Sequence, residues 1–337
     1  PNYKDGSHIT EQASYLVVES GEWEMADGTR FSAGTTTTNK LTSAGFESIS
    51  FDNSFSDTPS LLTQVQSYNG TDWVTTRTDS ITGQSFKVSM QEEESLNSGG
   101  HATETIGWFA IDSGAANDGD TILEGGITGN SFDHNVSAGS FSASFTDAPA
   151  LIAKLGSYRG ADPASLRTTE ISSSGFEAFV AEEQSSDVEL GHIAESINFL
   201  ALNSSSGSLY ASAYSNIDSN SLTATATATA TDAAGNTSST SSALSITVNS
   251  TSSTLGEYGT LDLDHNWKTV SFNNTYTNPV VVVSDPSFNG GDPGNIRIKN
   301  IGSSSFEVRF QEPNYKDGSH ITEQASYLVV ESGEWEM

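Results

Sequence analysis

Charged and titratable residues recur in a fixed order along this 337-residue sequence. Each copy of the pattern has an arginine, then a glutamate, then His-x-x-Glu after a loop of variable length. Two carboxylates and an imidazole suit a divalent cation such as calcium, whereas an arginine beside a carboxylate suits a buried hydrogen-bonded network. We favour the network, and we expect each set to form one connected cluster inside its own repeat. The three sets are Arg77, Glu92, His101 and Glu104; Arg167, Glu182, His192 and Glu195; and Arg297, Glu312, His320 and Glu323.

Catalytic chemistry has less support in the sequence. Glu92 and Glu104 could act as the paired carboxylates of a glycosidase, but an enzyme seldom needs such a pair three times at even spacing. No Gly-x-Ser-x-Gly, His-Glu-x-x-His or phosphate-binding loop occurs. We therefore predict a protein that is not an enzyme. His134 and His265 both lie in Asp-His-Asn, which predicts a turn closed by the aspartate, with a calcium site as the alternative.

A long internal repeat sets the organisation of the chain. The first 25 residues recur letter for letter as residues 313–337, so the period is 312 residues, the offset between residue 1 and residue 313. We expect one period plus a short overlap from a longer tandem array. Residues 1–25 would then be the terminal strands of a preceding third-type module, packed either on the third module of an adjacent copy or as an added strand on an exposed sheet edge.

A weaker repeat inside the period aligns on the three arginines. Each arginine follows a glycine by seven residues, and a proline precedes that glycine by eleven. This alignment predicts three modules, at residues 26–114, 115–205 and 253–337, and an insert at residues 206–252. We expect the three modules to lie end to end, over a length on the order of 100 Å.

The modules have the residue pattern of β structure. Short apolar runs follow the prolines at 59, 149 and 279, and Asn-Gly at residues 69–70 and 289–290 favours tight turns. No segment has a sustained helical period. The sequence thus predicts an all-β protein of tandem antiparallel β-sandwich modules, three in each period.

The order of strands and loops resembles a known family. An early aromatic strand leads to the proline, then come a Gly-x-Asp loop, the arginine, a Phe-led strand and a closing apolar strand such as Trp108 to Ile111. This pattern is similar to the H-type lectin repeat, which implies a six-stranded β-sandwich that forms trimers and binds N-acetylgalactosamine-type sugars. The resemblance assigns no sugar-binding residue here. A lectin would need exposed aromatic side chains, for which Trp73, Trp108 and Trp267 are the candidates.

The insert has a different composition, with alternating threonine and alanine from Leu222 to Thr231 and a second strand pattern from Ser241 to Val248. The segment at residues 230–236 resembles the closing hairpin of bacterial Ig-like domains. About 47 residues are too few for a complete Ig-like sandwich of about 100 residues. The sequence therefore predicts a hairpin with a turn at Asp232 to Asn236. It would be either a truncated sheet whose apolar face a neighbour covers or a Ser/Thr-rich stalk with little core.

Overall charge restricts the partners. The chain has 43 acidic and 13 basic residues, a net charge of −30, and no cysteine. Such a surface disfavours nucleic acid and anionic membranes, and no apolar run reaches the length of about 18 residues that a membrane helix needs. We expect an extracellular or cell-surface repeat region of a giant bacterial protein, forming a structural fibre or adhesive stalk and contacting identical repeats. A multivalent lectin that binds glycans is the alternative function.

Overall fold

The computed structural model describes residues 13–117, 121–214, 223–226, 244–247, 253–288, 293–313, 323–325 and 328–330. These residues form β strands and one short 3-10 turn, η1 (Thr42–Ala44). The predicted all-β, antiparallel fold is therefore confirmed. In the described part of the chain, no helix has the length and apolar character needed to cross a membrane.

Three lobes of one design follow one another along the chain, each with an inner and an outer sheet. Lobe 1 has the inner order β3-β8-β5 and the outer order β4-β7-β6. Its strands are β3 (Arg30–Thr38), β4 (Glu47–Ser50), β5 (Ser60–Val65), β6 (Val74–Asp79), β7 (Ser85–Glu92) and β8 (Glu104–Ile111). Lobe 2 repeats this plan with β10 (Ile122–Ile127), β11 (Ser137–Ser140), β12 (Ala150–Leu155), β13 (Ala164–Ser172), β14 (Gly175–Glu182) and β15 (Ile197–Leu202).

Lobe 3 has the same outer sheet, but its inner strands are divided between two sheets. Its outer strands are β21 (Lys268–Ser271), β24 (Ser305–Gln311) and β23 (Asn295–Lys299). One inner sheet has the order β22 (Pro279–Val283), β1 (Ala13–Glu19), β20 (Thr260–Leu263) and β25 (Glu323–Ala325). The other inner strands, β26 (Leu328–Val330) and β19 (Ser253–Tyr258), belong to a seven-stranded sheet that also contains β3, β8 and β5 of lobe 1. β1 and the pair β25 and β26 come from the two identical ends of the sequence. Residues 13–19 thus lie in the third lobe of their own chain, which differs from the expectation that they finish a preceding module.

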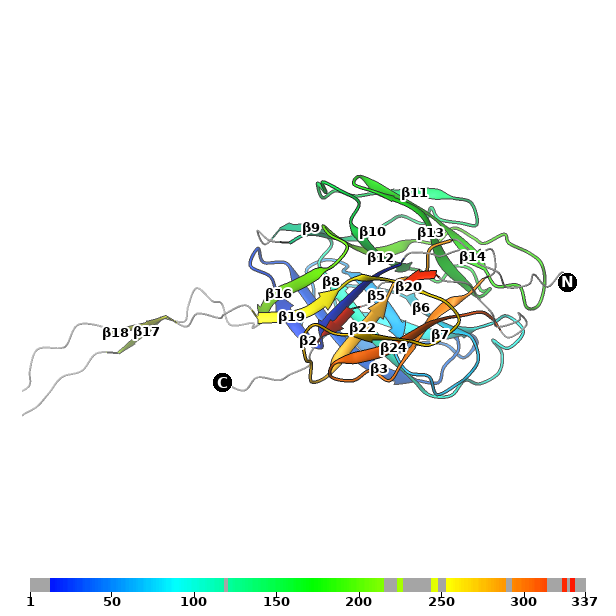
Figure 1. Ribbon diagram of the computed structural model, residues 1–337, viewed down its shortest axis with the longest axis horizontal. Helices are drawn as coiled ribbons and strands as arrows, with labels where there is room; N and C mark the ends of the chain where they lie inside the picture. The colour runs from blue at the N-terminus through cyan, green and yellow to red at the C-terminus, as the bar shows by residue number, and fades with distance from the viewer. Residues whose placement is uncertain are drawn as a thin grey trace, which may run out of the picture.

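Short hairpin strands lead into each lobe after a Ser-Gly pair. β2 (Gly21–Glu24) pairs with β3, β9 (Gly114–Asn117) pairs with β10, and β16 (Gly207–Ala213) pairs with β19. Residues 207–213 of the predicted insert form β16 and pair with lobe 3, and the rest of the predicted insert lies between β16 and β19. There β17 (Thr223–Ala226) and β18 (Leu244–Thr247) pair with each other and lie away from the lobes (Figure 1). The predicted turn at residues 232–236 lies outside the described residues.

The lobes share a central core. Equivalent inner-sheet residues Leu62, Ile152 and Val282 are at most 1% exposed and belong to one hydrophobic cluster. Lobe 1 and lobe 2 also have separate cores between their own two sheets. The expectation of modules placed end to end is therefore wrong, because the inner sheets bury apolar side chains against one another.

Candidate functional site: arginine and carboxylate contacts between lobes

Each repeated arginine reaches out of its own lobe. Arg77, on β6 of lobe 1, is fully buried, and its Nη2 donates to Glu195 Oε1 of lobe 2 at 2.6 Å. The same nitrogen donates to the Ser157 carbonyl at 3.2 Å, and Nη1 donates to Gln91 Oε1 at 2.9 Å. The guanidinium carbon lies 5.1 Å from the ring centre of Tyr158. Arg77 therefore joins lobe 1 to a loop and a strand of lobe 2.

Arg297 of lobe 3 makes the equivalent contacts with lobe 1. Its Nη2 lies 3.3 Å from Glu104 Oε1 and 3.5 Å from the Ser67 carbonyl, and its guanidinium carbon lies 4.6 Å from the centre of the Tyr68 ring. Nη1 donates to the Asp72 carbonyl at 2.7 Å. The arginine is fully buried.

Arg167 of lobe 2 continues the same order. Its Nε donates to the Ser287 carbonyl of lobe 3 at 3.0 Å, and Nη2 also contacts that carbonyl. Its guanidinium carbon lies 5.1 Å from the Phe288 ring centre. The arginine of lobe 1 therefore contacts lobe 2, that of lobe 2 contacts lobe 3, and that of lobe 3 contacts lobe 1. The expectation that each arginine joins the cluster of its own repeat is wrong, because three lobes around one core bring the arginine face of each next to the loop of another.

The glutamate of His-x-x-Glu anchors the loop that receives the arginine. Glu104 accepts hydrogen bonds from Ser67 Oγ at 2.5 Å and from the backbone N–H groups of Asn69 and Gly70 at 2.9 to 3.1 Å. In lobe 2, Glu195 accepts from Ser157 Oγ and from the backbone N–H groups at 159 and 160. Each carboxylate thus closes a turn and receives a neighbour's arginine.

In lobes 1 and 2 the glycine of the receiving loop lies against the repeated histidine. A Cβ atom placed on Gly70 would lie 2.4 Å from His101 Cε1, and one on Gly160 would lie 2.4 Å from His192 Cε1. Both histidines are less than a tenth exposed. The spacing of glycine, histidine and glutamate therefore follows from packing, since no side chain fits between the loop and the imidazole.

In lobes 1 and 2 the remaining glutamate of the set is buried beside the histidine. In lobe 2, His192 Nδ1 lies 2.6 Å from Glu182 Oε1 and Nε2 lies 3.3 Å from Glu195 Oε1. In lobe 1, His101 Nε2 is 3.7 Å from Glu92 Oε1, while Nδ1 contacts the Ala102 carbonyl at 2.9 Å. The expected cluster of histidine and two glutamates is present in both lobes, with different contacts.

These surroundings move two carboxyl pKa values in opposite directions. Burial, with the nearby charges of Asp72 and Glu93, raises the pKa of Glu92 to about 7. Burial also opposes ionisation of Glu195, but hydrogen bonds from His192 and Ser157 and the charge of Arg77 outweigh it and lower its pKa to about 2. Glu195 is thus held as an anion at neutral pH, whereas half of the Glu92 population is protonated there.

In lobe 3 the structure describes only part of the set. Arg297 and Glu312 are buried. His320 lies outside the described residues, and Glu323 is described only as the first residue of β25.

The described residues contain no group of three or more His, Asp or Glu side chains arranged to hold a metal ion. In lobe 2 the reason is visible, since serine, backbone and arginine donors already occupy the Glu195 oxygens.

Both Asp-His-Asn segments form the predicted turns. The Asn135 N–H donates to Asp133 Oδ1 at 2.7 Å, and the Asn266 N–H donates to Asp264 Oδ1 at 2.7 Å. The hydrogen bond from the Asn135 N–H lowers the pKa of Asp133.

Two of the three sugar-stacking candidates are wrong. Trp73 is 1% exposed and Trp108 is 8% exposed, so neither ring presents a face to solvent. Trp267 is half-buried, and its ring receives Lys299 Nζ at 4.0 Å and lies 5.2 Å from Tyr68 of lobe 1. Trp108 and Trp73 belong to the core. Their position in the sequence did not distinguish them from aromatic residues on the surface.

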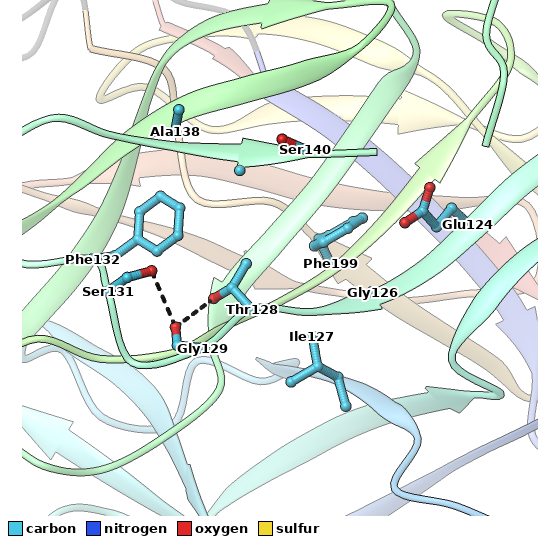
Figure 2. Close-up of a pocket in the computed structure, with 11 residues that line it drawn as sticks. Glu124, Gly126, Ile127, Thr128, Gly129, Ser131, Phe132, Ala138, Ser140 and Phe199 are labelled. Carbon is cyan, nitrogen blue, oxygen red and sulfur yellow. Dashed lines mark hydrogen bonds between the residues drawn. The ribbon is translucent and has the colours of Figure 1, made fainter. Parts of the chain in front are cut away.

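A cavity of about 300 Å³ opens in lobe 2 (Figure 2). Phe132, Phe199 and the backbone at Gly126 and Gly139 line it, and Ser131 and Thr128 donate to the Gly129 carbonyl at its edge. The strand pairing explains the space. In lobe 2, Gly139 pairs with Phe176, whereas Ile49 pairs with Phe86 at the equivalent position of lobe 1. On the closing strand, lobe 2 has Phe199 at the position of Trp108 in lobe 1. The two aromatic side chains that line the cavity, Phe132 and Phe199, are at most 3% exposed, so they offer no exposed stacking surface.

Sequence reasoning missed the residues that receive the arginines. They are a serine carbonyl and the next aromatic ring, at Ser67 and Tyr68, Ser157 and Tyr158, and Ser287 and Phe288. The signal was available, because Ser-Tyr or Ser-Phe precedes the aligned glycine by three residues in all three copies. It also missed Lys154, whose Nζ lies 2.5 Å from Asp285 and 3.3 Å from Gln64 where the three lobes meet.

Comparison with known proteins gives one relative and no family. The chain is 31% identical over 204 residues, 60% of its length, to Halomucin from Haloquadratum walsbyi. It spans only 2% of the length of that relative. No family model matches the sequence, and no solved structure matches it. The similarity to H-type lectins therefore stays a prediction.

Proposed function

We propose that this chain is the repeating body of a very large extracellular protein that acts as a structural fibre or adhesive stalk and has no enzyme activity. One observation carries the proposal: residues 1–25 recur as residues 313–337, an offset of 312 residues, and both copies supply strands to lobe 3 of one three-lobed body. A sequence that repeats with the period of its own folded unit is suited to a linear array.

The comparison and the charge agree with a surface repeat protein. The matched 204 residues are 2% of Halomucin, so that relative is about fifty times longer than the match. A net charge of −30 keeps a crowded array apart and soluble. The partners of each body would then be identical bodies before and after it, in place of nucleic acid or membrane.

The buried arginine contacts suit a structural role. Each arginine fixes one lobe to a loop of another through charged hydrogen bonds that water does not reach. Such contacts make three small sandwiches behave as one body. A sandwich of about 80 residues has a limited core of its own.

Electron microscopy of the native protein tests the proposal. A compact body of 312 residues has a diameter of about 50 Å, so filaments should show an axial repeat of that order. Particles of single bodies without an axial repeat would contradict it. The hairpin of β17 and β18 would add density beside each body.

The lectin alternative has weaker support from the described residues. A multivalent lectin needs exposed aromatic faces, and Trp73, Trp108 and both rings of the lobe 2 cavity are buried. The lectin function can be tested by applying one full 312-residue period to a glycan array and comparing its binding with that of the variant Trp267→Ala. Binding of a galactosamine-type sugar that this variant abolishes would favour the lectin.

A further inference from the structure

Lobe 3 can be closed by either copy of a repeated segment. In lobes 1 and 2 the closing strand comes from the same lobe, and it pairs on one side with the proline-led strand and on the other with the first strand. In lobe 3 the stretch between β24 and the end of the sequence is a copy of residues 1–25. Two segments of identical sequence therefore compete for one closing position.

The N-terminal copy takes this position against the proline-led strand. Val18 of β1 pairs with Val280 of β22, as Ile111 pairs with Ser60 in lobe 1 and Leu202 with Ala150 in lobe 2. These three closing residues all lie seven positions after the glutamate of His-x-x-Glu. The register of β1 is therefore the register of a closing strand.

The C-terminal copy has the matching register on the other side. Val330 of β26 pairs with Gly256 of β19, and Ala325 of β25 pairs with Leu261 of β20. Ala13, the copy of Ala325, also pairs with Leu261. The same residue of β20 thus pairs with both copies, one on each edge, in the same register.

The acceptor strand needs a partner. Residues Val280 to Val283 of β22 are at most 1% exposed in the closed lobe, and their backbone pairs with β1 alone among the described strands. Without a closing strand this apolar edge would face water, which is the usual route to pairing between chains. Among the described strands before residue 313, none but β1 pairs with β22.

We propose that lobe 3 is an acceptor for the 25-residue segment, and that a segment from a second copy of this chain can fill it. The closing strand then passes between neighbouring bodies and links them by strand addition. This inference deepens the proposed function and rests on it, since it names how consecutive bodies of the array join.

The absence of cysteine permits a direct test by disulfide trapping in the full chain. One variant carries Val280→Cys and another carries Val330→Cys; the two are unfolded together, refolded as a mixture and oxidised. Strand exchange predicts a disulfide-linked two-chain band on a non-reducing gel, with a yield that rises with protein concentration. The matched control replaces Val280→Cys by Ser140→Cys on β11, far from the acceptor edge.

A second variant keeps the test decisive. The double variant Val18→Cys with Val280→Cys should form an intrachain disulfide, and that locked chain should no longer bind a labelled peptide of residues 1–25. No two-chain band above the Ser140→Cys control, together with full trapping of Val18, would overturn the proposal. The axial repeat in micrographs would survive that result, so failure of strand exchange is distinguishable from failure of the array.

Discussion

Lobes 1 and 2 carry the same titratable set but hold it differently. His192 contacts both glutamates of its set, at 2.6 and 3.3 Å, whereas His101 lies 3.7 and 4.0 Å from its glutamates. The arginine contact differs in the same direction, since Arg77 lies 2.6 Å from Glu195 and Arg297 lies 3.3 Å from Glu104. The loop hydrogen bonds to Glu104 and Glu195 are nearly the same.

The difference separates what every lobe needs from what varies. The carboxylate that closes the loop and meets the arginine is held in the same way in both lobes. The contacts of the histidine differ between the lobes, whereas burial raises the pKa of the second glutamate in both, for Glu92 to about 7. A structural role for the loop-closing glutamate therefore explains the repetition better than a shared ligand site.

The largest effect should come from the arginines. Arg77→Met leaves Glu195 ionised and buried without its cation, which should lower the free energy of unfolding by roughly 3–5 kcal/mol. Arg297→Met should cost less, because its contact with Glu104 is longer. Chemical denaturation of the full chain measures both. Lys40→Met is the control, since its pair with Glu47 is about a third exposed and worth roughly 0–1 kcal/mol. Equal losses for all three variants would show that the lobes do not depend on these contacts.

Packing of glycine against histidine should give the next largest effect. Gly160→Ala places a methyl group 2.4 Å from the His192 ring, and Gly70→Ala does the same at His101. Overpacking of this kind costs roughly 1–3 kcal/mol, with the larger loss in lobe 2, where contacts with both glutamates fix the imidazole. Thermal unfolding measures it. Gly100→Ala, where the added atom meets nothing within 4 Å, is the matched control. A larger loss at Gly70 would reverse the comparison.

The pH dependence should distinguish the second glutamate of a set from the loop-closing glutamate by sign. The raised pKa of Glu92 contributes stability below its ordinary value of 4.5 that is lost as pH rises through about 7. Glu92→Gln should remove this loss and raise the melting temperature at pH 8 relative to the parent chain. The lowered pKa of Glu195 contributes stability above 4.5 that is lost as pH falls toward about 2. Glu195→Gln should therefore destabilise at pH 7, and less at pH 3. Melting curves at pH 3, 7 and 8 measure these effects. The assigned pKa directions would be contradicted if the two variants changed stability in the same direction at neutral and alkaline pH.

Sequence reasoning reached the strands and the equivalent residues, but not the partners. Alternation, prolines and turn residues are local, so they predicted β structure, and alignment of Arg77, Arg167 and Arg297 identified equivalent positions. The spacing within one repeat contains no information on how repeats pack. The contact of Arg77 with Glu195 depends on three inner sheets meeting in one core, so the set was assigned to one repeat. Burial of Trp108 follows from Gly34 beneath its ring, where an added Cβ would lie 2.6 Å away.

The smallest effect should come from the cavity that distinguishes lobe 2. Phe199 lies on Gly126 as Trp108 lies on Gly34, and the smaller ring leaves part of the space that the indole occupies in lobe 1. Phe199→Trp should therefore fill the cavity and change stability by about +0.5 kcal/mol or less, since gains from added volume are offset by strain. The reciprocal Trp108→Phe should create a cavity in lobe 1 and cost roughly 1 kcal/mol. Denaturant midpoints of the two single variants and of the double variant measure the exchange, and the effects should add because the lobes have separate cores. A loss at Phe199→Trp as large as that at Trp108→Phe would contradict this account, because it would show that the lobe 2 cavity does not accept the larger ring.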